Sequence, residues 1–260
     1  MMRPEQLNIS VLVSVGSHPK TGRSRRADQD ARAVEMALQL EQSQLQVLHA
    51  GQADEPALRQ YLGMGLACLD VLALPEGADV VPALVRELKQ SGADLVLTGV
   101  QAESGESSGL TPYLLAEQLG WAFVPRVAAI ESCSSGKLKV LQALPRGQRR
   151  AVQVTLPCVL SIDSAAPTPR QSAFGPAQRG QIQVLVPDSA TPVAQQDWQV
   201  QPARKRPKRL KMVKAKTAAE RFKAATAKAA SEGGQVLVPK TAEEGAAAIL
   251  KLLREEGVLR

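Results

Sequence analysis

Apolar and polar positions follow two repeating patterns over the first half of the chain. Short runs rich in Val, Leu and Ile predict buried strands, and stretches with apolar residues at every third or fourth position predict amphipathic helices. The predicted strands are residues 9–15, 44–49, 69–74 and 94–98. The predicted helices are residues 28–40, 56–64, 80–90 and 112–119. Strands that alternate with helices at this spacing indicate right-handed crossovers and a largely parallel sheet.

After Trp121 the pattern changes to short strands separated by turn residues. Residues 126–131, 137–144 and 149–154 predict three such strands, and the apolar run 151–162 predicts a longer one. We expect a small antiparallel addition and a return strand of the main sheet. The predicted fold class is therefore α/β, a mostly parallel sheet with flanking helices.

Residues 167–180 predict an exposed loop, because they are mainly Pro, Gly, Ser, Ala and Gln. Phe174 is the one large apolar residue in this loop. A lone apolar side chain on an exposed loop suggests a docking point for another protein. The alternative is that Phe174 folds back onto the domain.

The last part of the chain predicts a linker and helices. Residues 187–216 are polar, contain Pro and end in a basic stretch. Residues 217–230 and 241–255 predict two helices. We expect an α/β domain over residues 1–186 and a basic linker with a helical arm over residues 187–260.

Charge is concentrated in one segment. The net charge is +7, and residues 204–216 carry eight cations and no acid, so they account for the whole excess. Clustered Lys and Arg can bind phosphate polymers or anionic membranes, which leaves a nucleic-acid-associated protein as one alternative. The segment lacks aromatic side chains that stack on bases, so no nucleic acid is expected as a partner.

Candidate catalytic and metal-ligating residues are few. The two histidines, His18 and His49, have no evident Ser, Cys or Asp partner in the sequence, and the three cysteines are widely spaced. We therefore expect no catalytic residue, no metal ion and reduced thiols. The amino terminus lacks the apolar segment of a signal peptide, and no run approaches about 18 apolar residues. A cytoplasmic protein is expected.

The segment 100–112 has the composition of an anion-binding loop. It holds small and hydroxyl residues, and a predicted helix follows it directly. Backbone N–H groups can approach a ligand closely there, and the positive end of the helix dipole favours a phosphate. A nucleotide is the predicted ligand. The alternative is that Thr111 is only the N-cap and Pro112 the first residue of a surface helix, since no Walker or GxGxxG spacing is present.

In their order and spacing, several segments resemble the β subunits of electron-transfer flavoproteins. The similarity spans most of residues 9–187 and returns near 235–257. Its strongest parts are residues 94–102, 119–121, 138–142, 154–163 and 168–175. The resemblance implies an adenine-nucleotide α-hydrolase-like fold with a C-terminal arm that packs on an α subunit. It also implies a non-catalytic half of a heterodimer that relays electrons from flavoprotein dehydrogenases to a membrane quinone oxidoreductase.

The resemblance implies two cofactors. FAD would lie mainly on the α subunit, and a structural AMP would be bound by this chain. Residues 99–111 are similar to the AMP-binding loop of the family, and Asp30 is similar to the acidic residue that opens its first helix beside the adenosine. The residues implied for AMP are Ser14, Asp30, Ala50, Gln101, Ser107, Ser108, Gly109 and Thr111.

Residues 167–180 resemble the recognition loop of the family, in which a leucine usually stands where this chain has Phe174. The implied partners are flavin-dependent dehydrogenases, with those for methylated amines as one candidate class. The chain departs from the family at Gly16, where a basic residue is usual, and in loop 99–111, which is shorter and lacks a run of aspartates. A stand-alone adenine-nucleotide-binding regulatory module, which needs no flavin, is the alternative function.

Overall fold

The computed structural model describes residues 7–40, 43–75, 77–105, 107–186, 217–220, 222, 238–239 and 241–255. The chain divides into two compact units, Met1–Asp197 and Trp198–Arg260. Helix α7 (Ala242–Glu255) belongs to the second unit. The predicted linker 187–216 and most of the predicted helix 217–230 lie outside the described residues. Within the described ranges, no helix is long and apolar enough to cross a membrane.

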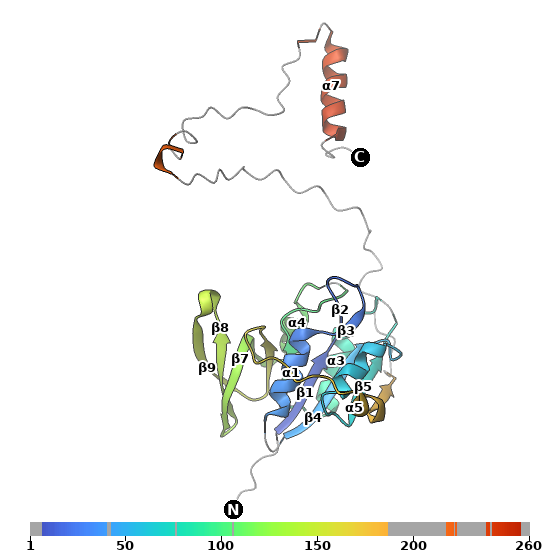
Figure 1. Ribbon diagram of the computed structural model, residues 1–260, viewed down its shortest axis with the longest axis vertical. Coiled ribbons are helices and arrows are strands. Elements are labelled where there is room, and N and C mark those ends of the chain that lie inside the picture. The colour runs from blue at the N-terminus through green and yellow to red at the C-terminus, as the bar shows by residue number, and fades with distance from the viewer. Residues whose placement is uncertain are drawn as a thin grey trace, which may run out of the picture. The chain divides into compact units, whose positions relative to one another are not determined.

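Nine strands of the described residues form one sheet in the first unit (Figure 1). Their order across the sheet is β11-β5-β4-β1-β6-β10-β7-β8-β9. The strands are β1 (Leu7–Val13), β4 (Ser43–Gly51), β5 (Cys68–Ala73), β6 (Leu95–Gly99), β7 (Ala122–Ser134), β8 (Lys137–Ala143), β9 (Arg149–Thr155), β10 (Cys158–Ile162) and β11 (Gln181–Leu185). Neighbours are parallel from β11 to β7, and β7, β8 and β9 are antiparallel. The predicted α/β class with a mostly parallel sheet is confirmed.

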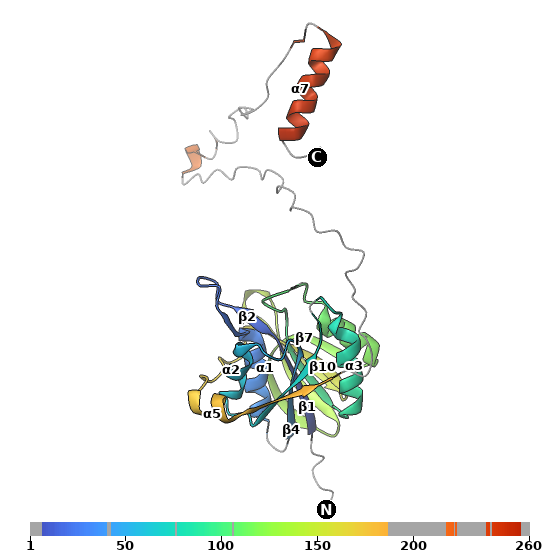
Figure 2. The ribbon, with the colours of Figure 1, turned by 90° about the vertical axis from the view of Figure 1, so that its right-hand side faces the viewer.

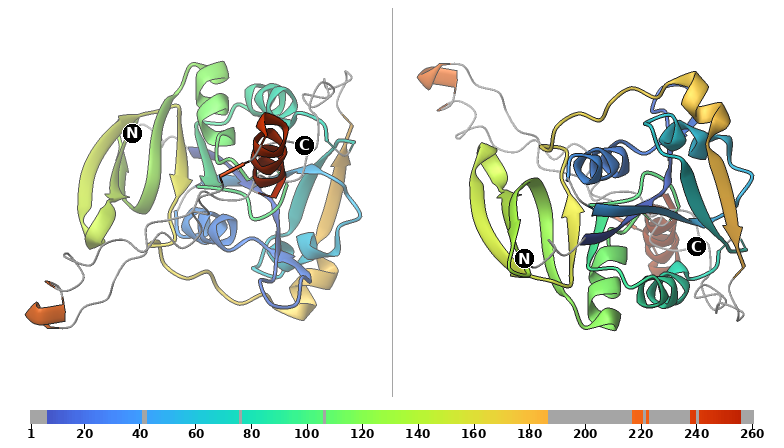
Figure 3. Two further views of the ribbon diagram at one scale, coloured as in Figure 1. Left: turned by 90° about the horizontal axis from the view of Figure 1, so that it is seen from above. Right: turned by 90° about the horizontal axis from the view of Figure 1, so that it is seen from below.

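Helices cover both faces of this sheet (Figures 2 and 3). On one face lie α1 (Asp28–Leu38), the short pair η1 (Pro56–Leu58) and α2 (Arg59–Leu62), and α5 (Phe174–Arg179), which packs against α2. On the other face lie α3 (Val80–Gln90) and α4 (Thr111–Leu119). Strands β2 (Val15–Ser17) and β3 (Ser24–Arg26) form a separate hairpin, and η2 (Pro145–Gly147) connects β8 to β9.

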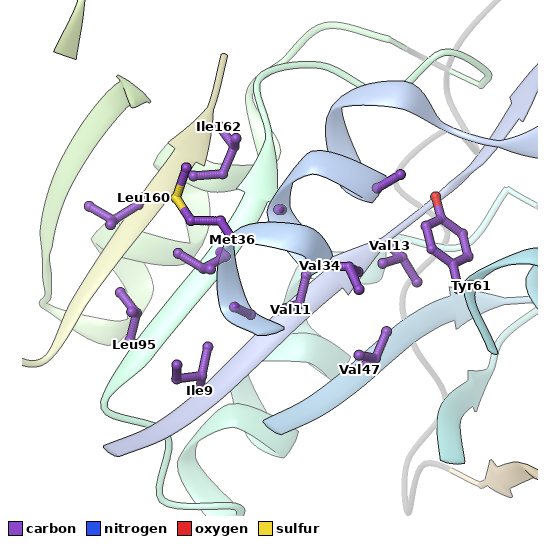
Figure 4. Close-up of a cluster of buried hydrophobic side chains, with 14 of the residues drawn as sticks. Ile9, Val11, Val13, Val34, Met36, Val47, Tyr61, Leu95, Leu160 and Ile162 are labelled. Atoms are coloured by element: carbon purple, nitrogen blue, oxygen red, sulfur yellow. The ribbon is translucent and has the colours of Figure 1, made fainter. Parts of the chain in front are cut away.

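The central strands are buried on both faces, which explains their continuous apolar sequences. Ile9, Val11 and Val13 of β1 lie in the core beneath α1, where Tyr61 of α2 is also fully buried (Figure 4). Leu12 of the same strand packs on the opposite face, beneath α3. A parallel strand covered by helices on both sides needs apolar side chains at successive positions.

Two predicted strands have different ends in the structure. The first strand ends at Val13 rather than at residue 15, because the N–H of Ser14 donates to Asp30 instead of a neighbouring strand. The predicted strand 151–162 is wrong as a single strand. It is divided between β9 and β10 at the cis-linked Leu156–Pro157, where Pro157 has no N–H for a sheet and the N–H of Leu156 donates to Gly136 O.

Strand β7 bends sharply at Arg126. A straight strand of its length would separate the two ends by about 40 Å. Its first residue pairs with Cys158. Its last residue pairs with Lys137, which pairs in turn with Thr155, only three residues before Cys158. The two ends are therefore close together, and the positive φ of 57° at Arg126 marks the bend.

The sequence pattern does not predict β11 or α5. β11 lies at the edge of the sheet and pairs only with β5 among the described strands. Its side chains do not alternate regularly between more exposed and less exposed positions. α5 has six residues and lies inside the segment 167–180, which was predicted to be loop throughout. Both elements are short and depend on contacts with other parts of the domain.

Candidate functional site

The strand order reverses between β1 and β6. From β1 the chain continues to β4 and β5 on one side and later to β6 and β10 on the other. In such sheets ligands bind in the crevice at the carboxyl ends of the strands where the order reverses. Ser14 follows β1 and Gly99 ends β6, so both lie at this edge of the sheet, where the order reverses. Loop 99–111, which was predicted to bind a nucleotide, leaves the sheet at the same place.

The carboxylate of Asp30 joins these two strand ends. Asp30 lies in the first turn of α1 and is buried. Its Oδ2 accepts hydrogen bonds from Ser14 N at 2.7 Å and from Ser14 Oγ at 2.5 Å, and its Oδ1 accepts one from Gly99 N at 2.9 Å. Burial raises the pKa of Asp30 to about 6, although the hydrogen bonds from Ser14 and Gly99 act in the opposite direction.

The first part of loop 99–111 is held by the amino-terminal end of α1. The side-chain oxygen of Gln29 accepts hydrogen bonds from Val100 N at 2.9 Å and Gln101 N at 3.3 Å. Glu103 accepts hydrogen bonds from Asp28 N at 2.8 Å and from Arg25 at 2.9 Å. The open N–H group at the start of α1 is thus satisfied by a carboxylate of the chain itself.

Glycine at position 16 makes room for Glu103. A Cβ atom there would collide with the Glu103 carboxylate and lie 3.1 Å from Ala27 Cα. Ser104 adds a further link, because its hydroxyl donates to Val15 O at 2.5 Å. The β2–β3 hairpin, α1 and loop 99–111 therefore form one connected unit. The sequence pattern does not predict this role of Glu103, because only the fold brings it next to Asp28.

The second part of loop 99–111 has an unusual backbone. Gly105, Ser107 and Gly109 all have positive φ, with values of 72°, 51° and 74°. Left-handed residues alternating with others are typical of backbone nests that bind anions. The amide of Gln101 donates to Ser107 O, which closes the loop from inside. A Cβ at Gly109 would lie 3.0 Å from Val100 O, so glycine is required for this path.

Helix α4 begins at Thr111, and its N-cap is Leu110, which has no side-chain cap. The alternative in which Thr111 is the N-cap is therefore wrong by one position. The hydroxyl of Ser108 accepts a hydrogen bond from Leu110 N at 3.2 Å. The start of α4 thus lies directly after the glycine- and serine-rich part of the loop. The side chain of its N-cap residue, Leu110, accepts no hydrogen bond from the first N–H groups of the helix.

The structure arranges the residues implied for AMP along the carboxyl edge of the sheet. Ser14 and Asp30 lie together at the crevice, and Ala50 lies near the end of β4, the strand next to β1. The other five residues lie in or directly after loop 99–111. The positive-φ backbone and hydroxyls near Ser107 and Ser108 fit a phosphate group. The carboxylate of Asp30 accepts hydrogen bonds from Ser14 and Gly99, which places it beside the same two strand ends.

Phe174 is exposed at the first position of α5, with 80% of its surface accessible. This excludes the alternative in which the side chain folds back onto the domain. The segment that carries it is held by hydrogen bonds to the rest of the domain. Ala173 N donates to Gly63 O at 2.9 Å, and Arg59 donates to Ala177 O at 3.1 Å. A large apolar side chain therefore projects from a segment that is held in place.

An ion pair between a buried glutamate and a half-exposed arginine fixes the start of the same loop. Arg170 donates from Nε and Nη2 to the two carboxylate oxygens of Glu35, at 2.7 Å and 3.0 Å, and its backbone N donates to the same carboxylate at 3.1 Å. Glu35 is buried in α1. Hydrogen bonds from Arg170 hold the pKa of Glu35 below its usual value, although burial acts in the opposite direction. The sequence pattern does not predict this pair, because the two residues are 135 positions apart.

Each of the two histidines contacts a backbone group of the domain through its ring. His49 is buried, its Nδ1 lies 2.8 Å from Val13 O, and burial lowers its pKa. His18 accepts a hydrogen bond from Thr21 N at 3.2 Å in the turn between β2 and β3. Across the described parts of the chain, no group of three or more His, Cys, Asp or Glu residues is placed to hold a metal ion.

The α/β domain with its mostly parallel sheet and the exposed Phe174 agree with a known class of protein. Residues 22–190 match the family model of the electron transfer flavoprotein domain. The chain is also 55% identical over 231 residues to the electron transfer flavoprotein subunit beta of Chromohalobacter salexigens, a match that covers 84% of this chain and 85% of that protein. The chain therefore belongs to the β-subunit family of electron-transfer flavoproteins. Members of this family take part in electron transfer and are associated with flavin.

Proposed function

We propose that this chain is the β subunit of a heterodimeric electron-transfer flavoprotein and has no catalytic residue of its own. In this role it relays electrons from flavin-dependent dehydrogenases to a membrane quinone oxidoreductase, in the cytoplasm. The observation that carries the proposal is the 55% identity to a β subunit over most of both chains. The α subunit is the partner that completes the heterodimer.

FAD, held mainly by the α subunit, supplies the redox chemistry because a flavin accepts and passes on electrons. This chain binds AMP against loop 99–111. The backbone and hydroxyl groups of Ser107, Ser108 and Thr111 hold the nucleotide, while Gln101 and Gly109 shape the loop. The positive φ values in this loop support the assignment. Asp30 acts indirectly on the nucleotide, because its hydrogen bonds hold Ser14 and Gly99 in position at the edge of the site.

The C-terminal residues 187–260 act as a linker and arm that pack on the α subunit. Helix α7 supports this role, because Ile249, Leu250 and Leu252 are exposed on it. Exposed apolar side chains on an amphipathic helix require a covering surface. The basic stretch 204–216 lies outside the described residues and belongs to the same arm.

Phe174 is the anchor that docks with the partner dehydrogenase. A lone apolar anchor on a fastened loop gives a small interface, which permits the rapid exchange of partners that an electron carrier needs. Its exposure supports this role. Dehydrogenases for methylated amines are one candidate class of electron donor.

The experiment that tests the proposal is co-expression of this chain with an electron-transfer flavoprotein α subunit from the same organism. The complex would be purified, and its nucleotides would be released and identified by absorbance and mass spectrometry. We expect a yellow heterodimer that yields FAD and AMP in equal amounts. A colourless chain that does not bind the α subunit but does bind ATP would instead identify a stand-alone nucleotide-binding module.

A further inference from the structure

A row of buried polar side chains lies on the α4 face of the sheet, near the carboxyl ends of β6 and β10. Val96 of β6 and Val159 of β10 pack in the core beneath α4. Side chains alternate between the faces of a strand, so Thr98 and Ser161, two positions further along, lie on this face too. Thr98 and Ser161 are direct neighbours across the two strands, and both are buried.

Asp163 continues this row beyond the end of β10. Its backbone N still donates to Val127 O of β7 at 2.9 Å, so the chain keeps the path of the strand. Its side chain is buried, and its Oδ1 accepts a hydrogen bond from Ala165 N at 2.9 Å. A buried carboxylate at this place requires a cation or donors to satisfy its remaining oxygen.

Arg126 supplies that cation from the bend of β7. Its backbone N donates to Ser161 Oγ at 3.1 Å, and its Nε donates to Asp163 Oδ2 at 2.9 Å. Its side chain is 57% exposed despite this ion pair. In the part of the chain that the structure describes, its two terminal nitrogens make no hydrogen bond. The guanidinium is therefore oriented by one nitrogen, while the other two remain available to a ligand.

Loop 99–111 lacks a cation of its own. The Glu103 carboxylate adds a negative charge beside this loop, in the space next to Gly16. Two guanidinium nitrogens of Arg25 already donate within the chain, Nη2 to Glu103 and Nε to Ser17 O. A phosphate bound by this loop therefore needs a positive partner from another element. Arg126 is close in the fold, because Ile162 pairs with Gly99 on one side and with Val127 on the other.

On the basis of the proposed nucleotide function of loop 99–111, we propose that Arg126 is a ligand-binding residue that donates its terminal N–H groups to the phosphate of the bound nucleotide. Guanidinium groups match the oxygens of a phosphate with two parallel hydrogen bonds. Asp163 is a positioning residue, since it holds Nε and leaves Nη1 and Nη2 for the ligand. The strained backbone at Arg126 places this side chain at the carboxyl edge.

The test compares AMP with adenosine, which differ only in the phosphate. Both would be titrated calorimetrically into the purified heterodimer after its nucleotide has been removed. Charge-assisted hydrogen bonds contribute roughly 1.5–3 kcal/mol, so Arg126→Gln is expected to weaken AMP binding by about 10- to 100-fold. Adenosine binding should stay unchanged. Arg126→Lys should recover part of the AMP affinity, because it restores the charge without the fixed geometry.

Two variants control for charge and for folding. Arg146→Gln removes another arginine with a positive φ, in the β8–β9 connection, and is expected to change neither affinity. Arg126→Gly suits the left-handed backbone, so it removes the guanidinium without strain and should repeat the loss of AMP binding. An unchanged ratio of AMP to adenosine affinity in Arg126→Gln and Arg126→Gly would overturn the role of Arg126 and leave the nucleotide site intact. A wild-type heterodimer that binds neither compound would overturn the nucleotide site itself.

Discussion

Asp30 shows how one buried carboxylate connects the two halves of the sheet. It receives three hydrogen bonds from the ends of β1 and β6, yet burial still raises its pKa to about 6. The cost of removing the charge from water therefore exceeds the stabilisation by these donors. Because this pKa still lies below 7, the carboxylate remains charged at neutral pH.

This raised pKa predicts a pH dependence of stability. Asp30 has an ordinary pKa of 3.8 and a folded value of about 6, so the folded state binds more protons than the unfolded state between these values. The contribution to stability is complete below pH 4 and is lost as the pH rises through 6; it amounts to about 3 kcal/mol. Urea unfolding of the wild type and of Asp30→Asn from pH 4 to pH 7 measures it. The stability of the wild type should fall relative to the variant, and parallel curves would contradict the assignment.

At the level of elements, loop 167–180 is organised by its contacts with α1 and α2 rather than by its own sequence. Glu35 of α1 holds Arg170, and Gly63, which follows α2, holds Ala173. A side chain at Gly63 would collide with Ser172. Loop and helices thus form one surface from which Phe174 projects.

The Glu35–Arg170 pair gives a prediction for this element. Glu35→Gln should loosen the loop, speed tryptic cleavage after Arg170 and Arg179, and lower the free energy of unfolding by about 1–3 kcal/mol, with the lower end favoured because Arg170 is half exposed. Because the pKa of Glu35 is lowered, its contribution is present above its unfolded pKa and is lost as the pH falls through the folded value.

A matched control is Glu131→Gln, which removes a pair with Lys139 in which both side chains are partly exposed. Exposed pairs of this kind contribute about 0–1 kcal/mol, so its stability and its cleavage pattern should stay close to those of the wild type. Equal cleavage rates in Glu35→Gln and Glu131→Gln would show that the ion pair does not hold the loop.

At the scale of the whole molecule, the first unit carries both the proposed nucleotide site and the proposed docking residue Phe174. The proposed nucleotide site lies at the carboxyl edge between β1 and β6, and loop 167–180 is bonded to α1. An electron carrier needs both a firm hold on its cofactors and a weak, reversible contact with its partners. In the proposed function, separate elements provide these two properties.

Phe174→Ala tests the docking role without disturbing the fold. Because Phe174 is exposed, its removal should change the free energy of unfolding by less than about 0.5 kcal/mol. The KM of the donor dehydrogenase for the heterodimer should rise by about tenfold or more, measured by flavin reduction under steady-state conditions. Val184→Ala, which removes an exposed apolar side chain from β11, is the control and should leave KM unchanged. Equal KM values for both variants would remove Phe174 from the interface.

The sequence alone determined the α/β class, the order of the main elements, and the positions of loop 99–111 and the exposed Phe174. These features are local, because apolar periodicity and glycine-rich loops follow from the residues nearest in the chain. It did not determine the division of residues 151–162 or the bend at Arg126. The tertiary structure decided these, together with the Asp30, Glu103 and Glu35 contacts, because each joins residues that only the strand order brings together. Distant hydrogen bonds leave no periodic trace in a sequence, so their partners emerge only from the fold.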